Sequence, residues 1–349
     1  MSQWSHGVVA RFDGASDQKL IALKAAFRAE GLAGIADDWP PHITLATYET
    51  APVDALLAWT AEYAAGQAPF PVALGACGVF PPGGSNPDTA VLYAAPASSR
   101  RLVDFYFGFH RKFDEHAGAS GWLYSAAFGY PAIHATLGIL PTHRMQRAFD
   151  LVFASGIFGR AEVQALEVYA RPLERLARYP LGVRTIVVIP WQREWPEAFA
   201  QIKGELENAL AGAVLAIEHV GSTAVPGLAA KPIIDIDIVI EANAFDTVKQ
   251  RLAAMGYAHT GDQGVPGREA FHYTNKEHLM THHLYVCPKD SPELRRHLAL
   301  RDCLRANPRL RDRYSQVKIT LAAQHPHDIN AYLDGKGPVV QEIYRAWGI

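Results

Sequence analysis

Apolar and polar positions along the first half of the chain follow two different periods. Alternation at every second position predicts strands, whereas apolar residues repeating at three- and four-residue spacing predict helices. The predicted strands cover residues 7–12, 42–48, 70–80, 89–95, 131–140, 161–170 and 179–189. The predicted helices cover residues 17–30, 53–65, 98–117 and 142–155. Strands and helices mixed in this order indicate an α+β domain.

The second half of the chain starts a new series of elements after Arg184. Its predicted strands cover residues 185–189, 213–219, 233–240, 270–274 and 280–286. Helices are predicted over residues 196–211, 244–255, most of 291–323, and 338–347. This series also indicates an α+β domain.

Length and composition support this division. The chain has 349 residues, of which 49% are hydrophobic and 19% charged. A single domain usually has about 100–200 residues, and this composition is ordinary for globular proteins. We therefore predict two domains, residues 1–182 and residues 183–349, each with its own hydrophobic core.

Charge and cysteine usage narrow the class of protein. The formal net charge is −2, so any binding of a polyanion must come from local patches of positive charge. Cys77, Cys287 and Cys303 form no disulfide framework, which favours a reducing compartment. The sequence shows no secretory signal and no apolar run of about 18 residues. We expect a cytoplasmic protein that does not enter membranes.

One short motif occurs twice in the first half. His42-Ile43-Thr44-Leu45 and His134-Ala135-Thr136-Leu137 lie on two predicted strands, 92 residues apart. Because side chains alternate along a strand, the histidine and threonine of each motif share one face and the aliphatic pair takes the other. Two lobes placed together could therefore line one cleft with two imidazoles and two hydroxyls.

Such a cleft suits phosphodiester chemistry. A neutral imidazole can take a proton from the attacking oxygen, and a protonated one can give a proton to the leaving oxygen. Threonine hydroxyls can hold the other phosphate oxygens, and no metal is needed. Tyr48 and Tyr130 flank the motifs and could either stack on a base or pack in the core.

The paired motifs resemble the 2H phosphoesterase superfamily, which includes the 2′-5′ RNA ligase-like and cyclic phosphodiesterase branches, over about residues 4–180. The resemblance implies a two-lobed fold with antiparallel sheets and a catalytic tetrad of His42, Thr44, His134 and Thr136. It also implies action on 2′,3′-cyclic phosphates or 2′-5′ linkages of nucleotides or RNA ends, without a cofactor. Two unrelated histidines, or a fold of this type that has lost catalysis, are the alternatives.

A second constellation lies in the other half. Gly221-Ser222 precedes a β-branched strand that carries Asp235 and Asp237. Two residues apart on a strand, these carboxylates face the same side, where a cation such as Mg²⁺ would neutralise them. The glycine and serine can offer backbone N–H groups and a hydroxyl to a phosphate.

This constellation resembles the nucleotidyltransferase fold, with a mixed sheet and helices. The string from His219 to Ile236 is closer to the GrpB family, and the resemblance covers about residues 185–347. It implies nucleotide binding by Gly221, Ser222, Lys231, Arg301 and Lys318. It also implies Mg²⁺ (or Mn²⁺) held by Asp235 and Asp237, with His283 in place of a third carboxylate that the sequence does not show.

The two resemblances together predict a bifunctional enzyme. The N-terminal domain would cleave cyclic or 2′-5′ phosphodiesters, and the C-terminal domain would transfer nucleotidyl groups. In the alternative interpretation, the C-terminal domain only binds nucleotides or RNA for the first site. Expected partners are nucleotides or RNA ends, including tRNA. The sequence does not indicate the oligomeric state.

Overall fold

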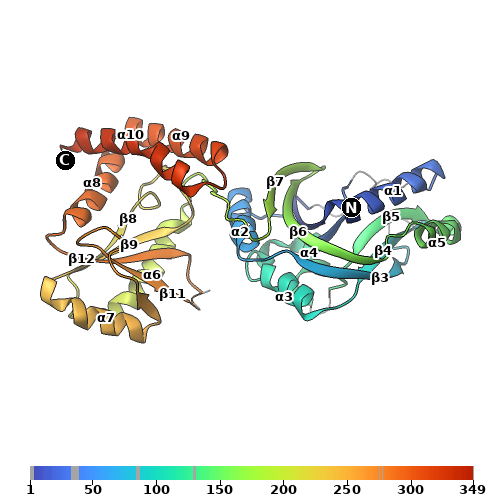
Figure 1. Cartoon of the computed structure of the whole chain (residues 1–349), viewed down its shortest axis with the longest axis horizontal. Coiled ribbons are helices and arrows are strands. Elements are labelled where there is room, and N and C mark those ends of the chain that lie inside the picture. Colours follow the sequence, from blue (N-terminus) through green and yellow to red (C-terminus); the bar gives the residue numbers. More distant parts are fainter. Residues whose placement is uncertain are drawn as a thin grey trace. The chain divides into compact units, whose positions relative to one another are not determined.

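The computed structural model describes residues 4–32, 39–83, 87–128, 131–274, 276 and 278–348. The chain divides into two compact units, Met1–Thr185 and Ile186–Ile349. Both contain helices and mixed or antiparallel sheets, so the predicted α+β class is confirmed (Figure 1).

The first unit is built on one antiparallel sheet of seven strands. Its order is β2-β1-β6-β3-β4-β5, with β7 also paired to β6. The strands are β1 (His6–Phe12), β2 (His42–Tyr48), β3 (Phe70–Phe80), β4 (Thr89–Pro96), β5 (Ala135–Pro141), β6 (Gly159–Ala170) and β7 (Glu174–Pro180). The longer helices are α1 (Gly14–Ala29), α2 (Val53–Ala65), α3 (Arg100–Phe109) and α5 (Met145–Ala154).

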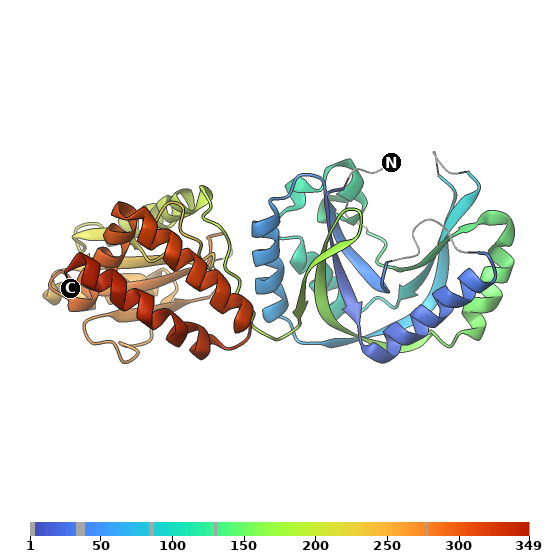
Figure 2. The same cartoon turned by 90° about the horizontal axis from the view of Figure 1, so that it is seen from above.

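Strand β6 joins two lobes of this sheet. Its first part, Gly159–Val163, pairs with β3, whereas Ala165–Ala170 pairs with β7. The edge strands β2 and β5 belong to different lobes, yet they contact each other because the sheet curls. Helices α1 and α5, one from each lobe, also lie side by side (Figures 1 and 2). The predicted two-lobed arrangement is confirmed.

Three predicted elements of the first unit differ from the structure in their bounds. The strand predicted over residues 179–189 is β7, which covers Glu174–Pro180. The other two were too long. The helix predicted over residues 98–117 ends at Phe109, and Phe113 beyond it adopts a left-handed conformation with φ of 71°. Beyond it, short helical turns run through η1 (Asp114–His116), α4 (Gly118–Gly121), η2 (Trp122–Tyr124) and η3 (Ala126–Phe128). The strand predicted over residues 131–140 begins only at Ala135, so His134 immediately precedes β5.

The second unit has a five-stranded sheet of order β10-β11-β12-β9-β8. Strands β9 and β12 are parallel and the other pairs antiparallel, so the predicted mixed sheet is confirmed. Its strands are β8 (Ala216–Val220), β9 (Ile234–Ile240), β10 (Tyr257–His259), β11 (Glu269–Tyr273) and β12 (His282–Pro288). Its helices are α6 (Glu194–Leu210), α7 (Phe245–Ala254), α8 (Pro292–Ala306), α9 (Pro308–Gln324) and α10 (Ile329–Trp347).

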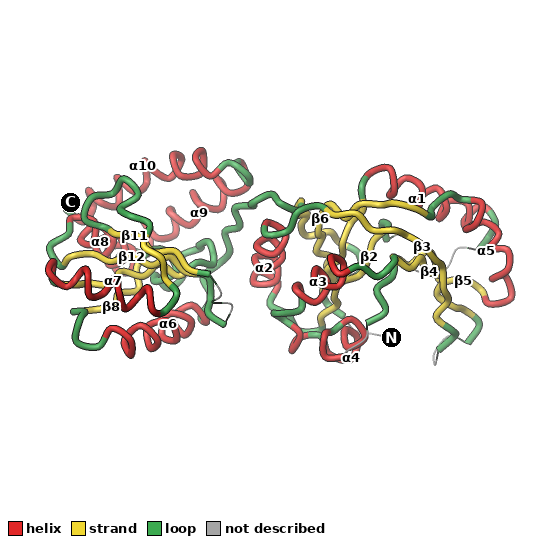
Figure 3. Tube along the Cα trace, turned by 60° about the horizontal axis from the view of Figure 1, so that its bottom comes forward, coloured by secondary structure: helices red, strands yellow, loops and turns green. Residues whose placement is uncertain are grey.

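These helices form two layers around the sheet (Figures 1 and 3). Helices α6 and α7 lie on one side and α8, α9 and α10 on the other. The strand predicted at residues 185–189 is wrong, because only Ile189 forms a β-bridge, to Ala230. Helix α10 begins nine residues before its predicted start at 338 and includes Pro338. Among the described residues, no helix combines the length and the apolar composition needed to cross a membrane.

Candidate functional site

The two motif histidines are held in the same way. His42 lies on β2 and His134 immediately before β5. In each ring Nδ1 lies 2.6 Å from a backbone oxygen two residues earlier, that of Pro40 or of Ala132. When Nδ1 donates to that carbonyl, the neutral ring keeps its lone pair on Nε2. The two imidazoles therefore present equivalent reactive nitrogens.

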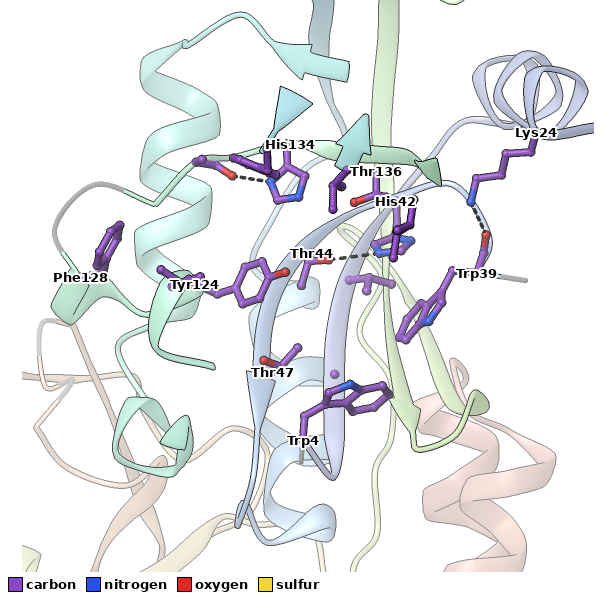
Figure 4. A pocket seen from close by; sticks show the side chains of 17 residues that line it. Trp4, Lys24, Trp39, His42, Thr44, Thr47, Tyr124, Phe128, His134 and Thr136 are labelled. Atoms are coloured by element: carbon purple, nitrogen blue, oxygen red, sulfur yellow. Dashed lines mark hydrogen bonds between the residues drawn. The ribbon is translucent and has the colours of Figure 1, made fainter. Parts of the chain in front are cut away.

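All four motif side chains reach one cleft, with a volume of about 720 Å³ (Figure 4). Thr44 Oγ1 lies 3.1 Å from His42 Nε2. The aliphatic partners on the opposite face are buried in the core, as the alternation predicts: Ile43, Leu45, Ala135 and Leu137. The structure thus brings the predicted tetrad together, and its catalytic role stays a prediction.

Burial determines the protonation state of the two imidazoles in this cleft. It lowers the pKa of His42 to about 4, and the nearby positive charges of Lys24 and Arg11 act in the same direction. Burial also lowers the pKa of His134. Both rings are therefore mainly neutral at pH 7 in the free protein, since an ordinary histidine has a pKa of 6.5.

Several residues of the cleft were not predicted from the sequence. Lys24 lines it, and its Nζ donates a 2.9 Å hydrogen bond to the carbonyl of Trp39. Tyr124 also lines the cleft, and burial raises the pKa of its hydroxyl. The sequence did contain a signal for Lys24, because this lysine stands among the apolar positions of its helix. Trp39 and Tyr124 gave none, because they lie outside the regular strands.

The structure answers the question of base stacking for one of the two tyrosines that flank the motifs. Tyr48 is completely buried and packs in the core, so it cannot stack on a base. Tyr130 lies outside the described residues.

In the second unit, Asp235 and Asp237 lie on the same face of β9, as predicted, but in different environments. Asp235 is partly exposed, and its Oδ1 lies 2.8 Å from His283 Nδ1. Asp237 is completely buried, and its Oδ2 lies 2.7 Å from His297 Nδ1 on α8. Burial raises the pKa of Asp237 despite this imidazole. Helix α8 therefore covers one of the two carboxylates.

A third carboxylate does lie on a neighbouring strand. Glu218 on β8 is directly opposite Asp237 in the antiparallel register. Only the strand register reveals this, so the sequence could not. Arg301 Nη1 donates a 2.7 Å hydrogen bond to Glu218, and its Nε donates to Asp302. The predicted nucleotide ligand Arg301 is thus bound to acidic side chains.

Some features of the β9 face that carries Asp235 and Asp237 fit a divalent cation. Asp237 Oδ1 is buried and has no hydrogen-bond partner among the described residues. Mg²⁺ commonly takes one or two carboxylates and completes its shell with phosphate and water oxygens. The described residues contain no group of three or more His, Cys, Asp or Glu arranged around a metal position. Asp235 and Asp237 are the residues that could hold such an ion, and His283 contacts Asp235; the ion itself stays a prediction.

A cluster of lysines lies beside Ser222. The buried Lys318 donates a 2.8 Å hydrogen bond from Nζ to Ser222 Oγ. The Nζ atoms of Lys231 and Lys336 lie 5.9 and 4.7 Å from the centroid of the Tyr332 ring. Burial and the neighbouring lysines lower the pKa of Lys318 far below its usual value, and that of Lys336 to about 8.

Gly221 allows the chain to turn next to this cluster. Its φ is 70°, and a Cβ at this position would overlap the Asp235 side chain. Gly221 and Lys318 thus lie near Asp235, Ser222 contacts Lys318, and Lys231 lies near Lys318; their role in nucleotide binding stays a prediction. Lys336 was not predicted as a site residue, although it stands four residues after Tyr332, a spacing that makes two side chains neighbours on a helix.

Comparison with protein families supports both halves of the prediction. Residues 16–174 match the model of the 2′-5′ RNA ligase superfamily, and residues 185–346 match the model of the GrpB protein family. The glutamate-rich protein GrpB of Alkalihalophilus pseudofirmus is 34% identical over 170 residues, which are 47% of this chain and 97% of that protein. The chain belongs to the GrpB family.

Other relatives of this GrpB-family chain match the same half. The protein YqkA of Bacillus subtilis is 38% identical over 156 residues, and the match covers 44% of this chain and 44% of YqkA. The chain therefore spans less than half the length of YqkA. A crystal structure of GrpB from Enterococcus faecalis is 32% identical and covers 46% of this chain and 99% of its own, with a TM-score of 0.41. Escherichia coli LigT complexed with NADP⁺ is 18% identical and covers 52% and 99%, with a TM-score of 0.32.

Proposed function

We propose that the first unit is a metal-independent phosphodiesterase that acts on 2′,3′-cyclic or 2′-5′ phosphodiesters of nucleotides or RNA ends. One observation carries this proposal. The Nδ1 atoms of His42 and His134 each contact a backbone carbonyl, and both imidazoles line the same cleft. The match to the 2′-5′ RNA ligase superfamily supports it.

The two imidazoles have different tasks in this mechanism. His42 has positive neighbours in Lys24 and Arg11, which favour its neutral form, so it is the base that takes a proton from the attacking oxygen. His134, in its protonated form, gives a proton to the leaving oxygen. Hydroxyls of Thr44 and Thr136 donate to the non-bridging oxygens, and Lys24 offsets the phosphate charge.

Turnover without metal tests this function. The purified chain is incubated with 2′,3′-cyclic nucleotides, 2′-5′ dinucleotides and cyclic-ended RNA in excess EDTA. We expect hydrolysis of at least one class at a rate that EDTA does not change. A broad panel without turnover, or turnover that EDTA abolishes, would rule the proposal out.

The pH dependence follows from the two imidazoles. Because one must be neutral and the other protonated, kcat/KM is greatest between their pKa values. Burial lowers the pKa of His42 to about 4 and that of His134 below 6.5, so the maximum should lie below pH 6.5. Above pH 6.5, kcat/KM should fall by about tenfold per pH unit. A pH–rate profile with its maximum at pH 7.5 or above would contradict this assignment.

For the second unit, the lysine cluster beside Ser222 favours nucleotide binding through the phosphates. We propose that Gly221, Ser222, Lys231 and Lys318 bind the phosphates, and that Asp235 and Asp237 hold Mg²⁺ (or Mn²⁺) for nucleotidyl transfer. A bound cation would neutralise charge on the reacting phosphate. Burial of Asp237 beneath His297 favours the alternative, a module that binds nucleotides for the first unit without chemistry.

Replacing Lys318 by methionine tests nucleotide binding. The phosphates of bound ATP oppose the lowering of the Lys318 pKa and favour its charged ammonium form. A hydrogen bond from that charged group is worth about 1.5–3 kcal/mol, so the Kd for ATP should rise by about tenfold to a hundredfold in calorimetry. Lys249→Met is the control, because Lys249 is exposed on α7. An unchanged Kd for the Lys318 variant would exclude this cluster as the phosphate site.

Pyrophosphate release separates the two interpretations of the second unit. Release from an NTP that needs Mg²⁺ and is lost in Asp235→Ala would support nucleotidyl transfer. Binding of NTP without release over a panel of RNA, alcohol and protein acceptors would support the non-catalytic module.

A further inference from the structure

One wall of the cleft comes from a segment without long helices or strands. This wall segment, residues 114–128, consists of the short turns η1, α4, η2 and η3, and its residues Leu123, Tyr124 and Phe128 line the cleft. Figure 4 shows the Tyr124 ring pointing towards Thr44. Isolated helical turns of three or four residues are not stable by themselves. The place of the wall segment therefore depends on the groups that hold it from behind.

The first part of the wall segment is attached to the edge strand β2. The Thr47 hydroxyl donates a 3.2 Å hydrogen bond to the carbonyl of Ser120, and the Ser120 N–H donates one of 2.9 Å to the Glu49 carboxylate. Gly121 follows directly, and a Cβ at this position would overlap the Thr47 carbonyl oxygen. The segment and the strand are thus in direct contact here.

The part that carries Tyr124 is attached through a buried imidazole. The His110 side chain is completely buried at the end of α3. Its Nε2 lies 2.9 Å from the carbonyl oxygen of Leu45, and its Nδ1 lies 2.6 Å from Asp114 Oδ1. Both partner atoms are acceptors, whereas a neutral imidazole has one N–H. Both ring nitrogens therefore donate, and the ring forms an ion pair with the Asp114 carboxylate.

Asp114 also binds the residues that follow Tyr124. Its other carboxylate oxygen, Oδ2, accepts hydrogen bonds of 2.8 Å from the Ser125 hydroxyl and of 3.0 Å from the Ala126 N–H. The Tyr124 carbonyl accepts a 2.9 Å hydrogen bond from the Tyr106 hydroxyl of α3. The backbone directly after the Tyr124 side chain is thus held by hydrogen bonds at two points.

These contacts form one path from the motif strand to the wall segment. Leu45 directly follows Thr44 in β2, and its carbonyl accepts from His110. From His110 the path continues through Asp114 to the backbone after Tyr124. Each link is a hydrogen bond, which fixes a direction as well as a distance, whereas hydrophobic contact is non-directional. The path therefore fixes the wall segment relative to β2.

Stability alone does not account for an ion pair at this place. Taking charges out of water is costly, and replacing a buried ion pair with apolar side chains of similar volume is often neutral or stabilising. What the pair adds is a fixed geometry between distant parts of the chain, since His110 lies 65 residues after Leu45. A role in positioning explains the pair better than a role in stability.

We propose that His110 and Asp114 are positioning residues of the first unit, which hold the wall segment so that Tyr124 keeps its place relative to Thr44. Neither His110 nor Asp114 is among the described residues that line the cleft, so both act through the residues they hold. This inference rests on the proposed phosphodiesterase function of the first unit. Loss of the pair loosens the wall segment and leaves the sheet with its two motif histidines in place.

The first experiment measures amide hydrogen exchange in the full chain with Asp114→Asn. The amide puts an NH2 group where the carboxylate has its second acceptor oxygen, so it cannot accept from both His110 and the Ala126 N–H. Exchange at Ala126 should become about tenfold to a hundredfold faster, the factor that a hydrogen bond to a charged group contributes. Exchange along β1 and β6 should not change. Ser125→Ala, which keeps the ion pair, should have the same effect by a smaller factor.

The second experiment measures the steady-state rate of phosphodiester cleavage in EDTA. Asp114→Asn should lower kcat/KM by about tenfold to a hundredfold, because a small misplacement near the reacting atoms has an effect of this size. In a chain that already carries Tyr124→Ala, the same substitution should change kcat/KM by less than about twofold, because coupled residues are not additive. Asp104→Asn is the matched control, since Asp104 is a carboxylate of α3 that is 63% exposed and does not line the cleft.

The outcomes separate the two proposals. Unchanged exchange at Ala126, or exchange that becomes equally fast along β1 and β6, would overturn this inference and leave the phosphodiesterase function intact. An unchanged kcat/KM, or a loss that is as large in the Tyr124→Ala chain, would also overturn it. Ser125→Ala decides the exchange comparison if Asp114→Asn does not fold. Absence of turnover in the unmodified chain would count against the proposed function itself, and exchange would still show whether the pair holds the wall segment.

Discussion

Replacing His42 by alanine is expected to lower kcat/KM for phosphodiester cleavage by about 10²–10⁴-fold, because proton transfer by a positioned side chain contributes about that factor. His134→Ala should cause a loss of the same order. The measurement is the steady-state rate of phosphodiester cleavage in EDTA with the substrate that the unmodified chain turns over best. The matched control is His143→Ala, because His143 is an exposed histidine of the same unit and does not line the cleft.

The double variant, with both His42 and His134 replaced by alanine, tests whether the two imidazoles act in the same step. If His42 and His134 act on the same transition state, removal of both should cost little more than removal of one, as in other catalytic groups that act as a unit. Losses that multiply in the double variant would indicate two independent effects on folding or binding. Single variants that retain more than a tenth of the activity would show that the tetrad is not the catalytic group.

The motif face was predictable because it depends only on alternation within a strand. His42 and Thr44 reach the cleft while Ile43 and Leu45 are buried, as a period of two dictates. The meeting of the two motifs was predictable only from their repetition and the resemblance that it carries. Its physical cause, the curling of a sheet whose edge strands are β2 and β5, depends on contacts between residues far apart in the chain.

The carboxylates of the second unit show where prediction from the sequence ended. Alternation placed Asp235 and Asp237 on one face, and the structure has them there. The burial of Asp237 comes from His297, which lies 60 residues further along the chain. The position of Glu218 comes from the register between β8 and β9. Neither the helix that covers a face nor the register of a strand pair follows from local periodicity.

The same distinction applies to Lys24 and Trp39. A lysine in an apolar helical stripe predicts a side chain that reaches a partly buried polar partner, but not which one. Its partner is the Trp39 carbonyl, three residues before β2. This part of the cleft lining is therefore visible only in the folded chain.

The largest effect on stability is expected at Glu167, whose side chain is completely buried in β6. Its carboxylate accepts hydrogen bonds from Arg11 at 2.6 Å, from Arg178 at 2.7 Å and from the Tyr169 hydroxyl at 2.7 Å. Burial alone would raise the pKa of Glu167, but the hydrogen bonds hold it below its usual value. The carboxylate is therefore ionised at neutral pH and neutralises the guanidinium groups around it.

Glu167→Ala should lower the free energy of unfolding of the first unit by about 3–5 kcal/mol. The reason is that the substitution leaves the Arg11 guanidinium buried without one of its two carboxylate partners. In the part of the chain that the structure describes, Asp17 is the ion-pair partner that Arg11 keeps, and the Arg11 side chain is 7% exposed. Amide hydrogen exchange along β1 and β6 measures the loss in the full chain without assuming that the two units unfold together. The control is Arg175→Ala, which removes a partner of Glu167 that is 54% exposed and should cost no more than about 1 kcal/mol. A loss below about 1 kcal/mol for Glu167→Ala would mean that water reaches Arg11 and that the buried pair does not stabilise the sheet on which the two lobes meet.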